Sequence, residues 1–93
     1  MATFEWDRNN LTKIRAHGIT REEAEQTLLN DPIPVYEQEV EGEPPFVYYG
    51  ETSAGRLLAA IVTERAGKIR VVTAYDLGSG QKREYLERRA QGE

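Results

Sequence analysis

The clearest pattern along the chain is a pair of apolar segments joined by a short turn, between residues 56 and 76. Residues 57–63 are almost continuously apolar, which is typical of a strand buried on both faces at the centre of a sheet. Ala66-Gly67-Lys68 predicts a short glycine-containing turn. Residues 69–75 alternate in side-chain character, as expected of a strand with two distinct faces. The whole stretch therefore predicts an antiparallel hairpin.

Three segments carry helix signals. Residues 8–16 follow Asp7, a good N-cap, and precede Gly18, which is the expected residue after a helix end. A second helix is expected from Thr20 to about residue 29, because T-R-E-E at residues 20–23 forms a capping box. The last helix is expected over residues 81–90, after a flexible joint at 77–80, with Tyr85 and Leu86 as its apolar anchors.

Three further strands complete the expected fold. They cover residues 3–6, 34–40 and 46–52, with a proline-rich loop at 41–45 between the last two. The order is β-α-α-β-β-β-β-α, and hairpin-joined strands after a pair of helices favour an α+β domain. We therefore expect one domain over residues 1–93, with a mainly antiparallel sheet and helices packed on one face.

Composition narrows the classes of function. The chain has no cysteine, so a thiolate metal site is excluded and a reducing cytoplasm is the expected compartment. No apolar run is long enough to cross a membrane, and the first residues do not resemble a signal peptide. The net charge of −4 argues against broad nonspecific nucleic-acid binding. Residues 51–93, however, hold 8 basic and 6 acidic side chains, against 4 and 10 in residues 1–50, so a local basic groove remains possible.

Several short blocks, in a fixed order, give the chain a family resemblance. The chain resembles the BrnT-like toxins, small bacterial proteins related in fold to the RelE ribonucleases. The blocks that carry the resemblance are FEWD at residues 4–7, Asn10, Lys13, His17-Gly18-Ile19, Glu22-Glu23-Ala24, the stretch from Gly55-Arg56 through Thr63-Glu64-Arg65 to Ile69–Ala74, and Tyr85. Together these blocks span nearly the whole chain.

The resemblance implies the toxin of a type II toxin–antitoxin system. Such a toxin is a metal-independent ribonuclease without a cofactor. It is neutralised by a cognate antitoxin, here expected to be a DNA-binding protein such as a ribbon-helix-helix protein. A homodimer or a toxin–antitoxin hetero-oligomer is the expected assembly. The chain departs from the family pattern at three positions: Tyr75 replaces an arginine, Gln81 a glutamate and Ala16 a lysine. A second interpretation is therefore a catalytically degenerate module that still binds an antitoxin or itself.

The expected catalytic residues are His17, Arg65, Arg70 and Tyr75. An unperturbed imidazole titrates at about pH 6.5 and suits either an acid or a base near neutrality. A guanidinium can hold two phosphate oxygens of the transition state at once. We expect the arginines and the imidazole to converge on one anionic cavity. The alternatives are that His17 only caps a helix end, and that the arginines pair with surface acids such as Glu64 or Asp76.

The expected substrate-binding residues are Lys13, Tyr85, Lys82 and Arg83. Lys13 precedes His17 by one helical turn and would add a charge at the same corner. The tyrosines would stack on bases, and the basic residues of the last helix would contact RNA phosphates. The alternative for each is an ordinary packed ring or a solvated charge. One histidine with scattered acids offers no ligand spacing for a metal.

Overall fold

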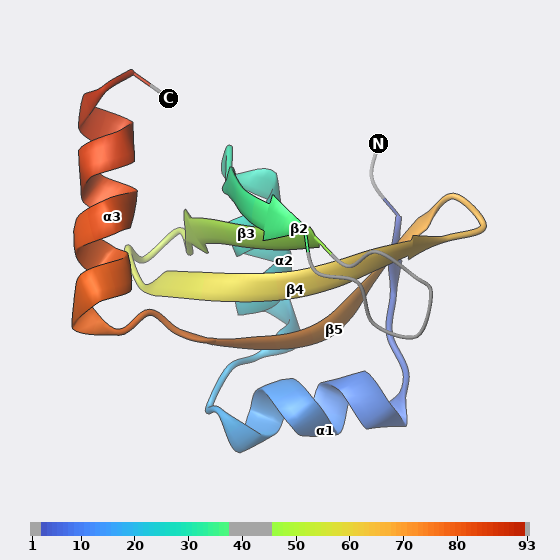
Figure 1. Cartoon of the computed structure of the whole chain (residues 1–93). Coiled ribbons are helices and arrows are strands. Elements are labelled where there is room, and N and C mark those ends of the chain that lie inside the picture. The colour runs from blue at the N-terminus through green and yellow to red at the C-terminus, as the bar shows by residue number, and fades with distance from the viewer. Residues whose placement is uncertain (1–2, 38–45, 93) are drawn as a thin grey trace.

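The computed structural model describes residues 3–37 and 46–92. Its elements follow the expected order: β1 (Phe4–Glu5), α1 (Arg8–Ala16), α2 (Arg21–Leu29), β2 (Ile33–Glu37), β3 (Phe46–Glu51), β4 (Leu57–Arg65), β5 (Lys68–Asp76) and α3 (Ser79–Ala90). The strands form one sheet in the order β1-β5-β4-β3-β2 (Figure 1). Neighbouring strands are antiparallel except for β1, which runs parallel to β5. The expected α+β class and order are confirmed.

The β4–β5 hairpin forms the centre of the sheet. Its turn residues, Ala66 and Gly67, both have positive φ, 53° and 79°. This is the backbone of a tight hairpin turn whose twist matches that of the flanking strands. The pairing runs from Arg65 opposite Lys68 to Leu58 opposite Asp76, with a β-bulge between Ile61 and Val62. The two ends of this long hairpin are therefore far apart, and they carry different side chains.

Local sequence signals position α1 and α2. The Asp7 side chain accepts a hydrogen bond from the Asn10 backbone and the Asn10 side chain returns one, which forms a capping box at the start of α1. Thr20 and Glu23 form the second box, at the start of α2. Gly18 ends α1 with a φ of 70°, a conformation that glycine adopts without strain. These three expectations are confirmed.

Each face of the sheet has its own apolar cluster. On one face, Ile14 of α1 and Ala24 of α2 pack against Leu58, Val62 and Val71 of the central strands. Tyr85 of α3 and Leu77 join the cluster on the other face, with Val47, Tyr49 and Ala59. The expectation that helices cover one face thus holds for α1 and α2, whereas α3 stands at the end of the strands and packs with residues of the opposite face (Figure 1).

Two expectations about the last helix were wrong. The segment 77–80 is not a flexible joint, because Leu77 is buried in the core and α3 already begins at Ser79. Leu86 is not an anchor, since it is 57% exposed while Tyr85 is buried. Adjacent helix residues point about 100° apart, so only one of the two can face the core.

The remaining boundaries agree within a few residues. The strand expected over 34–40 is β2, and its residues 38–40 lie outside the described part of the chain, as does the loop expected at 41–45. No helix in residues 3–37 and 46–92 is both long and apolar enough to cross a membrane.

Candidate functional site

The end of α1 meets the end of β5 beside the first turn of α3, at the left of Figure 1. His17 is the C-cap of α1, and Tyr75 is the second-last residue of β5. Their ring centroids lie 6.3 Å apart with the planes tilted by 53°. His17 is exposed and Tyr75 is half-buried. The structure therefore brings together an accessible imidazole and a phenol, two of the four expected catalytic side chains.

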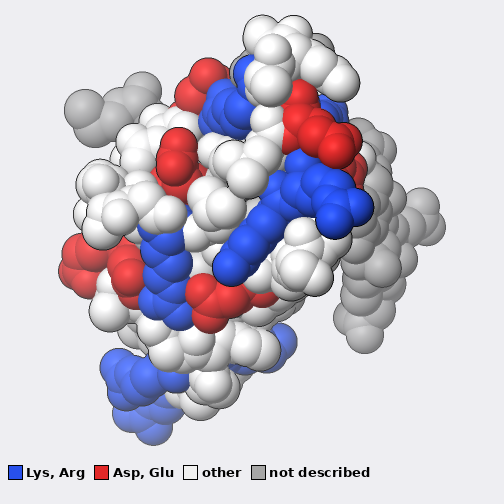
Figure 2. All heavy atoms as spheres, turned by 90° about the vertical axis from the view of Figure 1, so that its left-hand side faces the viewer, with Lys and Arg blue, Asp and Glu red and all other residues white. Residues whose placement is uncertain are grey.

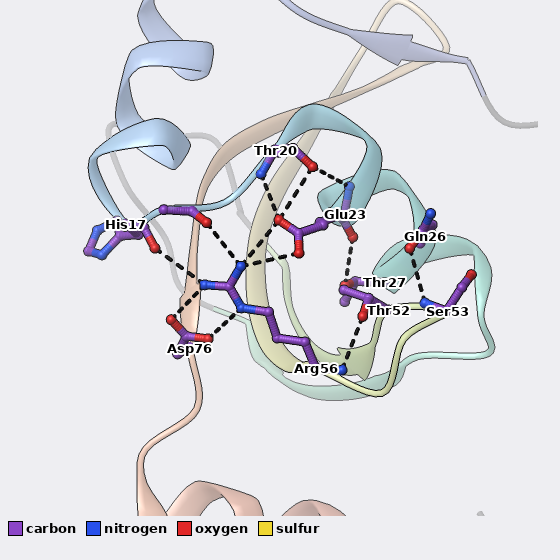
Figure 3. A network of polar contacts seen from close by, with 10 residues as sticks. His17, Thr20, Glu23, Gln26, Thr27, Thr52, Ser53, Arg56 and Asp76 are labelled. Carbon is purple, nitrogen blue, oxygen red and sulfur yellow. Dashed lines mark hydrogen bonds and ion pairs between the residues drawn. The ribbon is translucent and has the colours of Figure 1, made fainter.

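Arg56, which directly precedes β4, holds this corner together (Figure 3). Its Nε and Nη2 donate to the two carboxylate oxygens of Asp76 at 2.8 and 2.9 Å. Its Nη1 donates to the carbonyl oxygen of Gly18 at 2.9 Å and to the Glu23 carboxylate at 3.2 Å. Nη2 also reaches the carbonyl oxygen of His17 at 3.5 Å. A guanidinium has five N–H donors, so all are engaged and Arg56 has no donor left for a phosphate.

This network fixes the charges around His17. The hydrogen bond from Arg56 lowers the pKa of Asp76 below its usual range, and the charges of Lys82 and His17 act in the same direction. The hydrogen bond from the Thr20 backbone, together with Arg56, lowers the pKa of Glu23. The carboxylate partners in turn raise the pKa of Arg56, so its positive charge is retained at any working pH. Asp76 and Glu23 are therefore ionised at neutral pH, and neither is suited to donate a proton there.

Two lysines lie at this corner of the molecule. Lys13 is exposed on α1, one turn before His17. Lys82 is exposed in the first turns of α3, close enough to Asp76 to affect its titration. Arg83 is also exposed on α3 but, as the next residue, it points about 100° away from Lys82. Figure 2, which views the molecule from the side of α3, shows Lys and Arg interspersed with Asp and Glu. Phosphate binding here would depend on a few lysines rather than on a broad basic face.

The structure does not bring Arg70 to His17. Arg70 donates from Nη1 to the Asp7 carboxylate at 2.6 Å, and its side chain is only 19% exposed. This hydrogen bond lowers the pKa of Asp7. Asp7 caps the start of α1 and His17 caps its end, so a nine-residue helix of roughly 14 Å separates the two sites. The expected convergence of the arginines and the imidazole was therefore wrong.

Arg65 lies farther away still. It is the last residue of β4, beside the hairpin turn at the opposite end of the sheet from His17. Tyr75 lies five positions after Arg70 in β5, or roughly 17 Å along the extended chain. The sequence interpretation treated one strand as one surface, although a strand of this length reaches from one end of the domain to the other.

Tyr85 is placed as a core residue and not as a contact for RNA. It is 1% exposed, and its hydroxyl accepts a hydrogen bond from Arg89 Nε at 3.1 Å. The Arg89 guanidinium also covers the ring at 5.2 Å from its centroid. A base cannot stack on a ring that is enclosed in this way, so the structure contradicts the expected substrate-binding role of Tyr85.

The sequence interpretation named Arg56, Glu23 and Asp76 but did not predict that they contact one another or organise the corner. Arg56, Glu23 and Asp76 come from three different elements, and the partners of Arg56 are 20 and 33 positions away. Two signals were available: Arg56 belongs to a block that carries the family resemblance, and it directly precedes a largely apolar strand, where a charge needs partners if it is not free in solvent. Among the described residues, no three carboxylate or imidazole groups gather closely enough to hold a metal ion.

Comparison with known proteins shows which protein family the chain matches. A family model described as "Ribonuclease toxin, BrnT, of type II toxin-antitoxin system" matches residues 6–79. The matched range includes Lys13, His17, Arg56, Tyr75 and Asp76, and thus nearly the whole corner. No curated protein matches the chain.

Proposed function

Because this chain belongs to the BrnT family of ribonuclease toxins of type II toxin–antitoxin systems, we propose that it cleaves RNA at the end of the sheet where His17 meets Tyr75. The observation that carries this placement is the exposed imidazole, held on a fixed helix end with a phenol at 6.3 Å and lysines nearby. Acid–base cleavage of RNA needs such a titratable group within reach of the substrate.

The proposed reaction is an internal transfer at phosphorus. The 2′-hydroxyl oxygen attacks the adjacent phosphorus while a base removes its proton, and the bond to the 5′-oxygen breaks as that oxygen is protonated. The products are a 2′,3′-cyclic phosphate and a 5′-hydroxyl end. His17 serves as the acid or the base, and Tyr75 orients the ribose or the base beside it. Lys13 and Lys82 offset the charge that develops on the phosphorane oxygens, in place of a metal.

In this proposal, three arginines contact RNA away from the cleaved bond: Arg65, Arg70 and Arg83. Arg65 and Arg70 lie toward the hairpin end and α1's first turn, so they would contact phosphates that flank the cleaved bond. Arg70 would do so by exchanging Asp7 for phosphate oxygens, which present a similar geometry to a guanidinium. Arg83 would contact RNA from α3.

The test is cleavage of a short single-stranded RNA by the purified, antitoxin-free protein in EDTA. Replacing His17 with asparagine should lower kcat by about 10²–10⁴-fold, since this is the usual contribution of one acid or base. Arg21→Gln is the control, because Arg21 forms only an exposed ion pair with Glu25 on α2. Undiminished cleavage by the folded His17→Asn protein would remove His17 from the mechanism.

The ion pairs of two arginines support a second function, that of an antitoxin-binding module without ribonuclease activity. The guanidinium groups of Arg56 and Arg70 are both engaged by carboxylates, and Tyr75 stands where the family resemblance implies an arginine. These features favour a module that binds an antitoxin but no longer cleaves RNA. Induced expression separates the two: growth arrest that His17→Asn abolishes supports the enzyme, and harmless expression supports the module.

The family implies an antitoxin partner. We infer that this antitoxin binds DNA, as a ribbon-helix-helix protein would, and that the complex is cytoplasmic because that is where the RNA lies. Co-expression with the product of an adjacent gene, followed by co-purification, tests the pairing.

A further inference from the structure

The contacts of Arg56 point to a role beyond the reaction chemistry itself. We propose that Arg56 is the positioning residue of the catalytic corner: it fixes the backbone that carries His17 and occupies the carboxylate that would otherwise face the imidazole and the RNA. This inference rests on the proposed ribonuclease function for its kinetic consequences, but its structural part can be measured without any activity.

Arg56 joins four segments that are distant in sequence. It contacts carbonyl oxygens at the end of α1, the capping-box carboxylate of α2 and the last residue of β5. The fourth segment is β4, which begins at the residue after Arg56. Its own backbone nitrogen donates to the Thr52 hydroxyl at 3.0 Å, which fixes the start of β4 against the loop after β3. Through these bonds Arg56 links α1 to both α2 and β5.

The geometry restrains the backbone of His17 and leaves its ring free. The guanidinium reaches the carbonyl oxygens of both His17 and Gly18, the two residues that end α1. These carbonyls lie at the negative end of the helix, where a cation is favoured. Figure 3 shows the imidazole pointing away from the network while its carbonyl points into it. The ring therefore keeps its access to solvent and its contact with Tyr75.

Only an arginine satisfies all these acceptors. Nε and Nη2 bind Asp76 through two parallel N–H···O bonds. The remaining N–H groups, at the other edges of the planar guanidinium, bind Glu23 and the carbonyl oxygens at the end of α1. A lysine has three donors on one tetrahedral nitrogen and cannot reproduce this planar arrangement, although it keeps the charge. Position and charge can therefore be separated by substitution.

Charged groups reach the corner from every element packed there: Lys13 on α1, Glu23 on α2, Arg56 before β4, Asp76 on β5 and Lys82 on α3. Tyr75 on β5 adds a phenol. Without Arg56, two carboxylates would lose their common counter-charge. An uncompensated Asp76 favours the imidazolium form of His17 and repels a phosphate. The expected consequence is a displaced pH profile together with weaker RNA binding.

The experiment compares Arg56→Gln, Arg56→Lys and the control Arg21→Gln. Arg56→Gln should lower kcat roughly 10²-fold through loss of position. It should also raise KM and move the pH–rate profile toward higher pH, because the carboxylates lose their counter-charge. Arg56→Lys should lower kcat by a similar factor while leaving the pH profile and KM near those of the parent protein. Arg21→Gln should match the parent in all three quantities.

Two additions keep the test decisive if Arg56→Gln does not fold. Asp76→Asn removes the carboxylate and keeps the cation, so it should reduce kcat without a shift of the pH profile toward higher pH.

Proton NMR of the folded Arg56→Lys protein reports on the position of the His17 ring and needs no activity. The cross-relaxation between the His17 and Tyr75 rings should weaken. That measurement stands even if the parent protein proves unable to cleave RNA, which would overturn the proposed function alone.

Two outcomes would overturn the role of Arg56. One is a folded Arg56→Lys protein with parental kcat and an unchanged contact between the His17 and Tyr75 rings. The other is a folded Arg56→Gln protein with a parental pH profile, or one in which kcat falls only in proportion to the folded fraction measured by circular dichroism.

Discussion

The arginines and lysines discussed above serve different purposes in this protein. Arg56 and Arg89 are both partly covered and both bind acceptors from distant segments, Asp76 and Glu23 in one case and Asp31 in the other. The lysines near His17 are exposed. Guanidinium groups thus join elements together, whereas the ammonium groups remain available to an anionic ligand, as their stronger hydration favours.

The neighbours Tyr85 and Leu86 offer a direct test of which face of α3 is buried. Tyr85→Ala should lower the free energy of unfolding by about 3–5 kcal/mol, since it removes a fully buried ring from the core. Leu86→Ala should change it by no more than about 0.5 kcal/mol, because the side chain is 57% exposed. Urea unfolding of both variants measures the difference. Equal losses would contradict the placement of α3.

At the scale of elements, the features that the sequence predicted are those specified by near neighbours. The capping boxes of Asp7 and Thr20 each depend on a residue three positions later, and the β4–β5 turn depends on two adjacent residues. The orientation of α3 and the partners of Arg56 depend on residues 20 or more positions away. Such pairings follow from how whole elements pack, which the periodicity of a single segment does not contain.

The expected convergence of Arg70 with His17 and Tyr75 failed because β5 is long. Alternation correctly placed Arg70 and Tyr75 in one strand, but the sequence interpretation did not use the rise per residue, which puts these two residues roughly 17 Å apart along that strand. The placement of His17 beside Tyr75 required knowing that α1 runs along β5, and the sequence contained no signal for that packing.

The contact between α2 and β3 depends on a glycine. A Cβ atom built on Gly50 would lie 2.8 Å from the Thr27 carbonyl oxygen and 3.4 Å from Pro32 Cβ. Gly50→Ala should therefore destabilise the protein by about 1–3 kcal/mol through overpacking. Gly80→Ala is the matched control, because nothing lies within 4 Å of its Cβ position in α3. That change should stabilise the protein by up to about 1 kcal/mol through helix propensity, and thermal unfolding measures both.

At the scale of the whole molecule, ion pairs connect elements that lie far apart in the sequence. Arg70–Asp7 joins β5 to the start of α1, Arg56–Asp76–Glu23 joins β4, β5 and α2, and Arg89–Asp31 joins α3 to the segment before β2. The carboxylates of the first two groups must be ionised for these links to form. Acid should therefore loosen the arrangement of elements before it exposes the core.

The direction of this pH dependence follows from the pKa values. Those of Asp7, Glu23 and Asp76 are lowered in the folded protein from ordinary values of 3.8, 4.5 and 3.8, so the unfolded chain binds more protons in acid. Their contribution to stability is complete above about pH 5 and is lost as the pH falls through the lowered values. Urea midpoints measured from pH 6 to pH 2 should decline over this range.

Asp7→Asn provides the control for that decline. Asparagine keeps the helix cap and removes the ionised partner of Arg70. The variant should be less stable than the parent at pH 6 and should lose less stability toward pH 2. A decline as steep as that of the parent protein would mean that Asp7 does not contribute to it.

The parallel pairing of β1 with β5 governs when a newly made chain can complete this fold. Phe4 pairs with Ile69 and Glu5 with Arg70, whereas the other strand pairs join neighbours in sequence. During synthesis on a ribosome, β1 must wait unpaired until β5 has been translated, and Arg56 must wait for Asp76 in the same way. A nascent chain would thus acquire the corner around His17 only after β5 has been made, so a chain that stops before β5 lacks the arrangement proposed for cleavage.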